Sequence, residues 1–295
     1  MKFDLHTHTS ASDGQLQTEA LLARAAAAGV EVVAVTDHDT TDGIERYKAC
    51  APKLSSGRLN NTQPQHTPAR SVQTNDIQLI AGVEISTQWR GHAIHVVGLR
   101  IHPEATELEQ GLAAQRKARI DRAVLISQKL KKLGLPCVLD AALASATHGM
   151  VGRPHFAAQL VAAGVVKDVK QAFRKYLGAG KPGDVKHLWV SLEQAIAWIH
   201  AAGGQAVLAH PGKYQLTRTR LRTLVGEFSA AGGDAIEVVS GKQNQQVTQA
   251  LATLCQEAGL VASTGSDFHR PDESWADVGK QSTMPAGCKP VWDGW

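Results

Sequence analysis

The chain has 295 residues, of which 43% are hydrophobic and 20% charged, an ordinary composition for a globular protein with a full core. No apolar run approaches the roughly 20 residues that cross a bilayer, and the start does not have a signal-peptide pattern, so we expect a cytoplasmic protein without a membrane partner. The net charge of +4 is compatible with a phosphorylated substrate but too small to indicate nucleic-acid binding.

Three potential metal ligands follow the first apolar run. His6 and His8 are two residues apart, so in a β-strand they point to the same face and can hold one ion together. Asp13 comes after a short serine-containing turn and can reach a second ion nearby. The alternative is a structural pair of histidines. We favour a metal site at the end of this first strand.

The next unit repeats this pattern. A helix is predicted over 18–29, followed by a β-branched strand over 31–36 that ends at Asp37-His38-Asp39. The two aspartates either orient the ligand imidazoles or cap the turn after the strand, and the sequence leaves both readings open. Histidine and carboxylate residues therefore follow a second predicted strand.

Strand-like segments then contain a further acid and two histidines. A polar stretch over 53–76 is predicted to be a surface loop, and Glu84 lies in the apolar segment that follows it. His92 and His95 lie on opposite faces of the next strand, and we favour His95 as the residue that faces the site.

The residue pattern of the segment 104–189 differs from that of the flanking segments, because its periodicity is helical and β-branched strands are scarce. We interpret it as a small helical insertion with a basic face, which either steers the substrate or is simply solvated. Pro154 suits the first turn of a helix and would place His155 near the helix N-terminus, pointing inward. Arg153 lies beside it, and Lys181 lies in a glycine-rich segment without P-loop spacing.

The last third alternates helices and strands. The helices are predicted over 195–202, 221–231 and 246–258, and the strands over 205–209, 235–239 and 260–264. Such alternation implies a mainly parallel sheet that is closed or curled into a barrel, which gathers its strand-end residues at one end. The polar residues that end these strands are His210, Asp267 and His269.

These motifs resemble those of the PHP (polymerase and histidinol phosphatase) superfamily of metal-dependent phosphoesterases over most of the chain. The segments 152–155, 209–212 and 265–269 look most like its nucleotide-phosphatase and short-RNA-exonuclease branch. The resemblance implies an α/β fold, a distorted (βα)7 PHP-type barrel formed by 1–103 and 190–295, with a small helical domain inserted at 104–189. The stretch 53–76 departs from the family pattern because it is longer and more polar.

The resemblance also implies two or three divalent ions, with Mn²⁺ expected and Zn²⁺ or Fe²⁺ as alternatives. A hydroxide that bridges the ions would attack phosphorus, with His210, Asp267 and Arg153 in the catalytic group. Arg153 would contact phosphate, and His210 would bind phosphate or protonate the leaving oxygen unless it only ties a structural turn. Lys181 is a weaker phosphate candidate. The implied ligand sets are His6, His8, Glu84 and Asp267; Glu84, His95 and His155; and Asp13, His38 and His269.

We therefore expect a phosphatase that removes the 3′-phosphate from a nucleoside 3′,5′-bisphosphate to give a 5′-mononucleotide, with short RNA hydrolysed 5′ to 3′ as an extension. The substrate is a phosphorylated nucleotide or short oligoribonucleotide, and no stable nucleic-acid partner is predicted. Histidinol-phosphate phosphatase is the alternative within the superfamily. A non-catalytic RNA- or partner-binding module is the alternative of another class. The complete ligand set and the lack of an aromatic-rich stacking motif argue against that module.

Overall fold

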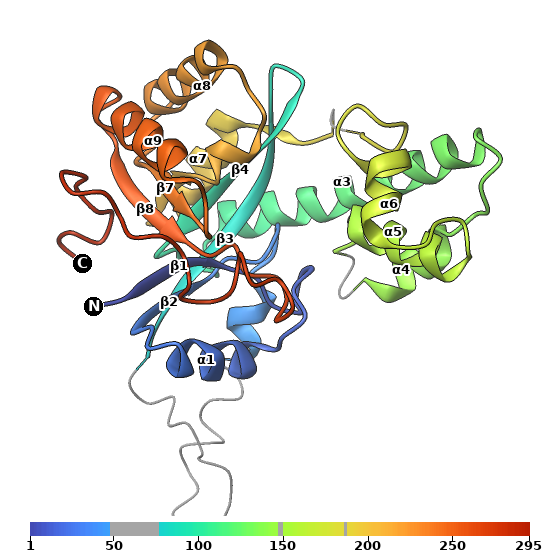
Figure 1. Ribbon diagram of the computed structural model, residues 1–295, viewed down its shortest axis with the longest axis horizontal. Helices are drawn as coiled ribbons and strands as arrows, with labels where there is room; N and C mark the ends of the chain where they lie inside the picture. The colour runs from blue at the N-terminus through green and yellow to red at the C-terminus, as the bar shows by residue number, and fades with distance from the viewer. Residues whose placement is uncertain (48–76, 147–149, 186–187) are drawn as a thin grey trace, which may run out of the picture.

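The computed structural model describes residues 1–47, 77–146, 150–185 and 188–295, so the polar stretch 53–76 lies outside the described residues. The chain forms a barrel-like sheet with helices around it and a helical lobe at one side (Figure 1). Within the described ranges, no helix is both long enough and apolar enough to cross a membrane.

The sheet has the order β1-β2-β3-β4-β6-β7-β8, and the short β5 pairs with β3. Main-chain hydrogen bonds from His8 to Phe268 and from Asp267 to His6, both 2.9 Å, join β1 to the end of β8 and nearly close the barrel. The strands are β1 (Phe3–Thr7), β2 (Val32–Val35), β3 (Gln78–Trp89), β4 (His92–Leu99), β5 (Val190–Ser191), β6 (Gln205–Leu208), β7 (Ala235–Ser240) and β8 (Val261–Gly265).

The sheet is mixed, because β4 runs antiparallel to both β3 and β6. Its direction follows from the two-residue hairpin Arg90-Gly91, whose φ angles of 46° and 78° are both positive. Two positive φ values are typical of the turn that matches the twist of paired antiparallel strands. The expectation of a mainly parallel barrel is confirmed elsewhere in the sheet: β1–β2–β3 and β6–β7–β8 pair in parallel.

Helices pack around the sheet close to their predicted positions. Ser191 caps α7 by accepting a hydrogen bond from the Gln194 amide at 3.3 Å. The helix predicted over 18–29 has Gln17 as its cap residue, and the Thr18 hydroxyl donates to the Gly43 carbonyl at 2.7 Å. The barrel helices are α1 (Thr18–Ala27), α7 (Leu192–Ala201), η3 (Pro211–Lys213), α8 (Arg218–Ala230) and α9 (Gln245–Glu257).

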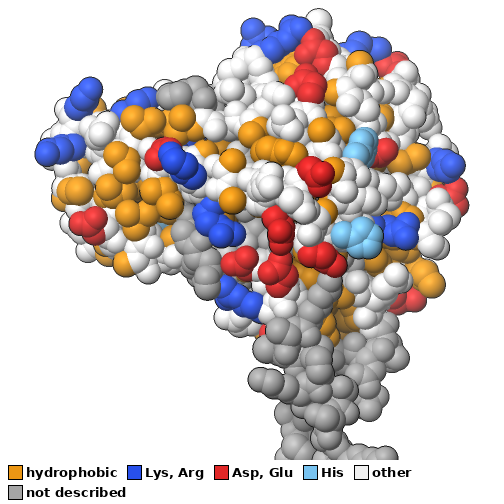
Figure 2. Space-filling model, turned by 180° about the vertical axis from the view of Figure 1, so that it is seen from behind, with side chains coloured by type: hydrophobic (Ala, Val, Ile, Leu, Met, Phe, Trp, Pro, Cys, Tyr) orange, Lys and Arg blue, Asp and Glu red, His pale blue; other side chains and the backbone are white. Residues whose placement is uncertain are grey.

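The helical lobe lies within the predicted insertion and has an apolar core of its own, which includes Ile126, Phe156, Leu160 and Leu177. Its first helix has 26 residues and is therefore about 39 Å long, so it reaches from the barrel into the lobe. From behind, hydrophobic side chains lie among lysines and arginines on the lobe surface (Figure 2). The lobe elements are α3 (Thr106–Lys131), α4 (Leu139–Ser145), α5 (Arg153–Ala162), α6 (Val169–Ala172) and η2 (Phe173–Leu177).

Apolar side chains from the strands fill the barrel, and the end of the chain closes its base. Trp292 stacks on Phe3 with ring centroids 4.2 Å apart, and the Trp295 indole donates to Gln205 at 2.8 Å. The opposite end of the barrel, where the parallel strands end, is where polar side chains collect.

Candidate metal centre

Glu84 on β3 is the hub of a buried cluster. Its Oε2 lies 2.9 Å from His38 Nδ1, 3.3 Å from His8 Nε2 and 3.4 Å from His6 Nε2. Its Oε1 lies 2.8 Å from His95 Nδ1 and 2.9 Å from His210 Nε2. Five imidazoles from four different strands or strand ends therefore converge on one fully buried carboxylate.

His6 and His8 lie side by side, with their Nε2 atoms 3.1 Å apart. Asp267 Oδ1 is 3.3 Å from His8 Nε2 and 3.5 Å from His6 Nε2, so the carboxylate after β8 faces both rings. On the other side of its ring, His6 Nδ1 lies 3.1 Å from the buried Glu237 on β7. That contact fixes the orientation in which Nε2 faces the cluster.

A third group forms where the first strand and the last strand end. Asp13 Oδ1 lies 3.3 Å from His269 Nε2, and Asp13 Oδ2 lies 3.9 Å from His38 Nε2. Ring atoms of His8, His38 and His269 and a carboxylate oxygen of Asp13 lie within 4.8 Å of one another. The structure thus brings together the residues expected for a third site.

Two histidines lie differently from the expectation. His210 belongs to a group with His6 and Glu84 that can hold an ion, although it was expected to handle substrate. His155 lies at the start of α5, where its Nδ1 accepts a hydrogen bond from the Gly152 amide at 3.0 Å, and it is in none of the ligand groups among the described residues. Its role as a ligand stays a prediction.

The cluster fits divalent metal ions. Several buried polar atoms have no hydrogen-bond partner among the described residues, including His8 Nδ1, Glu84 Oε2 and His210 Nδ1. A buried carboxylate oxygen that faces three imidazoles without a hydrogen bond carries a large desolvation cost unless a cation balances it. Nitrogen and oxygen ligands bind such ions at about 2.0–2.2 Å and so lie roughly 3 Å apart, the spacing seen here.

Electrostatics also favour ionised ligands. Burial opposes ionisation of Glu84, but the charges of His38, His95 and His6 hold its pKa well below the usual range. Burial likewise opposes ionisation of Asp267, and Lys213 and His6 hold its pKa well below the ordinary value. Both carboxylates are therefore anionic at neutral pH and ready to bind a cation.

The two aspartates beside His38 serve neighbouring segments. Asp37 accepts hydrogen bonds from the Thr9 amide and from the hydroxyls of Thr9 and Ser12, at 2.6 to 2.8 Å, and so fixes the loop after β1. Asp39 accepts from Arg119 Nε at 2.7 Å and from the Ser86 amide at 2.7 Å. It therefore ties α3 to the barrel beside the cluster.

A pocket lined by arginines adjoins the cluster. Arg119, Arg122 and Arg153 line it together with Trp189 and Phe173, and its other wall includes His38 and His95. Arg119 and Arg122 each lie over the Trp189 ring, 5.3 and 5.2 Å from its centroid. Burial and the positive charges of Arg153 and Arg119 lower the pKa of Arg122 to about 9, so the guanidinium groups of the pocket lie close enough to affect one another.

Sequence reasoning identified Arg153 but did not separate Arg119 and Arg122 from the exposed cations of the same helix. Arg153 Nη1 contacts the Leu177 carbonyl at 3.1 Å and Asp184 at 3.2 Å, inside the pocket wall. Lys181 is exposed and does not line the pocket. Two further residues were missed: Glu237, which the acid within the apolar run 235–239 could have indicated, and Lys213, which forms an ion pair with Asp267.

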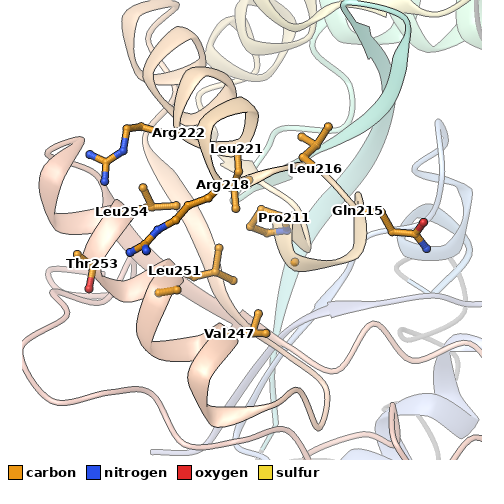
Figure 3. Close-up of a pocket in the computed structure, with 12 residues that line it drawn as sticks. Pro211, Gln215, Leu216, Arg218, Leu221, Arg222, Val247, Leu251, Thr253 and Leu254 are labelled. Carbon is orange, nitrogen blue, oxygen red and sulfur yellow. The ribbon is translucent and has the colours of Figure 1, made fainter.

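A second hollow lies outside the cluster, between α8 and α9 (Figure 3). It has a volume of about 410 Å³ and is lined mainly by apolar side chains such as Leu216, Leu221 and Leu251, and Arg218 extends across it. None of the cluster residues lines it, so the chemistry of the site is elsewhere.

Comparison with known proteins gives consistent matches. The profile of the PHP domain matches residues 4–183. A 3′,5′-nucleoside bisphosphate phosphatase of Chromobacterium violaceum is 40% identical over 290 residues, covering 98% of this chain and 94% of the relative. A 5′-3′ exoribonuclease of Escherichia coli, Rnm, is 42% identical over 299 residues, covering 99% of this chain and 93% of the relative.

Solved structures agree. A Chromobacterium violaceum protein described as an amidohydrolase, with bound sulfate and no metal, has a TM-score of 0.84 at 39% identity and covers 100% of this chain and 95% of its own. A structure from Bifidobacterium adolescentis, described as a metal-dependent phosphoesterase, has a TM-score of 0.73 at 26% identity and covers 98% of this chain and 92% of its own. The similarity thus spans barrel and lobe together.

Proposed function

This chain belongs to the PHP domain family, and from that premise we propose that it removes the 3′-phosphate of nucleoside 3′,5′-bisphosphates and shortens oligoribonucleotides from the 5′ end. It is a hydrolase of phosphate esters. Relatives that match it over nearly their whole length are named for these two activities, and both act on a phosphate attached to a nucleotide.

The observation that carries the proposal is the shared wall of the metal cluster and the arginine pocket. His38 and His95 belong to the cluster and also line the pocket that holds Arg122 and Arg153. A substrate with two phosphates can therefore place one at the cluster and the other against the guanidinium groups. Planar guanidinium forks suit phosphate because they donate two parallel hydrogen bonds.

Histidinol phosphate fits this arrangement less well. It has a single phosphate and a protonated amine, so a cationic group of the substrate would face the guanidinium groups that line the pocket. The alternative is therefore not favoured.

Nine residues would hold the ions, and we propose Mn²⁺ as the metal. When bound, the ions would lower the pKa of a water and offset charge on the phosphate oxygens. The ligands are His6, His8, Asp13, His38, Glu84, His95, His210, Asp267 and His269, with His155 as a further candidate from the lobe.

The chain's own groups prepare the substrate. Arg153 and Arg122 would hold the second phosphate. Glu237 would hold His6 and the backbone of His210 in position, because its Oε2 contacts His6 Nδ1 at 3.1 Å and accepts a hydrogen bond from the His210 amide at 2.7 Å. Burial lowers the pKa of His210, so its ring is neutral at pH 7. A neutral ring next to Glu84 can bind an ion or accept a proton, and a proton that it accepts can then be delivered to the leaving oxygen.

The test measures phosphate release by the purified protein in the presence of Mn²⁺. The substrates are adenosine 3′,5′-bisphosphate, 3′-AMP and histidinol phosphate. In a second assay, a 5′-phosphorylated pentaribonucleotide is incubated with the protein and the liberated mononucleotides are measured. We expect the bisphosphate to have the highest kcat/KM of the three monoester substrates, and activity to vanish in EDTA or with Glu84→Gln. Faster hydrolysis of histidinol phosphate, or equal rates with and without the 5′-phosphate, would contradict the proposal.

A further inference from the structure

The rim of the barrel opposite the arginine pocket offers a path for a nucleotide chain. The pocket adjoins residues at the ends of β2, β3 and β4 and the helical lobe. The loops after β6, β7 and β8 form the other part of the rim, with α8 and α9 behind them, and the lobe projects away on the far side (Figure 1). An oligoribonucleotide with its 5′-phosphate in the pocket and its first linkage at the cluster must leave over that other part.

One residue on this part of the rim is unusual. Trp275 is 60% exposed, whereas large aromatic side chains normally bury most of their surface. An exposed indole has a free face on which a base can stack. Single-stranded nucleic acids are held by such stacking, largely without regard to sequence.

The backbone holds Trp275 next to the metal cluster. Its carbonyl accepts a hydrogen bond from the Lys242 amide at 2.8 Å, and Lys242 follows Gly241, whose amide donates to Gly265 at 2.8 Å. A Cβ on Gly241 would lie 2.7 Å from the Trp275 carbonyl and 3.2 Å from that of Ser266, which precedes the ligand Asp267. No side chain other than hydrogen fits there, so the loop of Trp275 packs directly on the strand end that carries Asp267.

Cations lie on both sides of this point. Lys242 is exposed after β7, and Lys213 after β6 directs its ammonium group to Asp267. On the loop of Trp275, Glu273 is paired with Arg270 at 3.3 Å, and Asp272 has no ion pair with any residue that the structure describes. The charges named on this part of the rim balance, and Lys242 is the cation that has no ion pair among the described residues, so its ammonium group can meet a phosphate of a phosphodiester backbone.

We propose that Trp275, Lys242 and Lys213 form an exit face, on which the nucleotides downstream of the scissile linkage bind, with a base stacked on Trp275 and a phosphate beside Lys242. The inference rests on the proposed function and deepens it. It explains how a site for a small bisphosphate can also retain an oligoribonucleotide. The bisphosphate has no downstream nucleotide and makes no contact with the exit face.

The test compares the two substrates in Trp275→Ala, Trp275→Phe and Lys242→Gln, with Lys289→Gln as a surface-charge control. Lys289 is exposed and paired with Asp293, and its segment contacts the beginning of β8, at the opposite end of the strand from Asp267. Binding is measured by fluorescence anisotropy of a 5′-phosphorylated, 3′-labelled pentaribonucleotide in EDTA, where no turnover occurs. Turnover of the pentaribonucleotide and of adenosine 3′,5′-bisphosphate is then measured with Mn²⁺.

Loss of one stacked base, about 1–3 kcal/mol, should weaken binding of the pentaribonucleotide by Trp275→Ala by roughly 5- to 150-fold. The change to Phe should restore most of it. Lys242→Gln should make the dependence of log Kd on log salt shallower by about 0.7. Phosphate release from the bisphosphate should stay at the parent value in all four variants.

The exit face would be overturned by parent-like binding of the pentaribonucleotide by Trp275→Ala, or by an equal loss of activity on the bisphosphate. Failure of the parent protein to bind the pentaribonucleotide would also overturn it, while leaving bisphosphate hydrolysis intact. If the parent protein binds the pentaribonucleotide but releases no phosphate from the bisphosphate, the proposed function fails. The anisotropy measurements on the variants then still show whether Trp275 and Lys242 bind the pentaribonucleotide.

Discussion

Replacing Arg153 with Ala should weaken capture of the second phosphate while leaving the cluster in place. Arg153 Nη1 is held by the Leu177 carbonyl and Asp184, so the guanidinium group is fixed in the wall of the pocket, where it can face a ligand. Hydrogen bonds to charged groups contribute about 1.5–3 kcal/mol each, so loss of one such contact should raise KM for adenosine 3′,5′-bisphosphate by roughly 10- to 150-fold. The contact forms in the ground state, so kcat should change less.

The assay is phosphate release across a range of bisphosphate concentrations, with 3′-AMP as a matched substrate that lacks the second phosphate. Arg174→Ala is the control variant, because Arg174 is exposed on the same lobe and does not line the pocket. Thermal unfolding of each variant checks that loss of the Asp184 partner has not unfolded the lobe. The reasoning is refuted if Arg153→Ala loses as much activity on 3′-AMP as on the bisphosphate, or if it loses none on either.

Three further predictions concern the cluster and its support. Asp13→Ala should remove one bound metal per chain, measured by elemental analysis after Mn²⁺ loading, and should lower activity while the circular dichroism spectrum stays unchanged. Unchanged metal content would exclude Asp13 as a ligand. His210→Asn should lower kcat by roughly 10²–10⁴-fold if the ring transfers a proton to the leaving oxygen, whereas a higher KM with intact kcat would make it a phosphate contact. Asp39→Asn should lower the free energy of unfolding by about 3–5 kcal/mol, because it leaves the buried Arg119 without its ionised partner; a change below 1 kcal/mol in urea denaturation would show that this pair does not hold α3 to the barrel.

Much of the metal centre was predictable from local patterns. The pairing of His6 with His8 follows from strand alternation, and the same rule selected His95, which the structure places 2.8 Å from Glu84. The helix and strand positions of the last third were also close, because capping residues and glycines mark the ends of those helices locally. In each case, neighbours within a few residues carry the information.

Long-range pairing decided the remainder. Arg119 and Arg122 look like the exposed cations of α3 until the packing of the helix against the barrel buries them beside Trp189. The grouping of His210 with His6 and Glu84 depends on where each strand ends around the barrel, and the ligand role of His155 stays a prediction.

By itself, the sequence determined which residue types occupy the strand ends, since hydrophobic periodicity and short motifs are properties of adjacent positions. Only the tertiary structure decided which of those residues lie close enough to share an ion, which arginines line the pocket beside them and where Trp275 lies. Those relations join residues up to some 260 positions apart, such as His6 and Asp267, and no local pattern encodes the register or the closure of the barrel that brings them together.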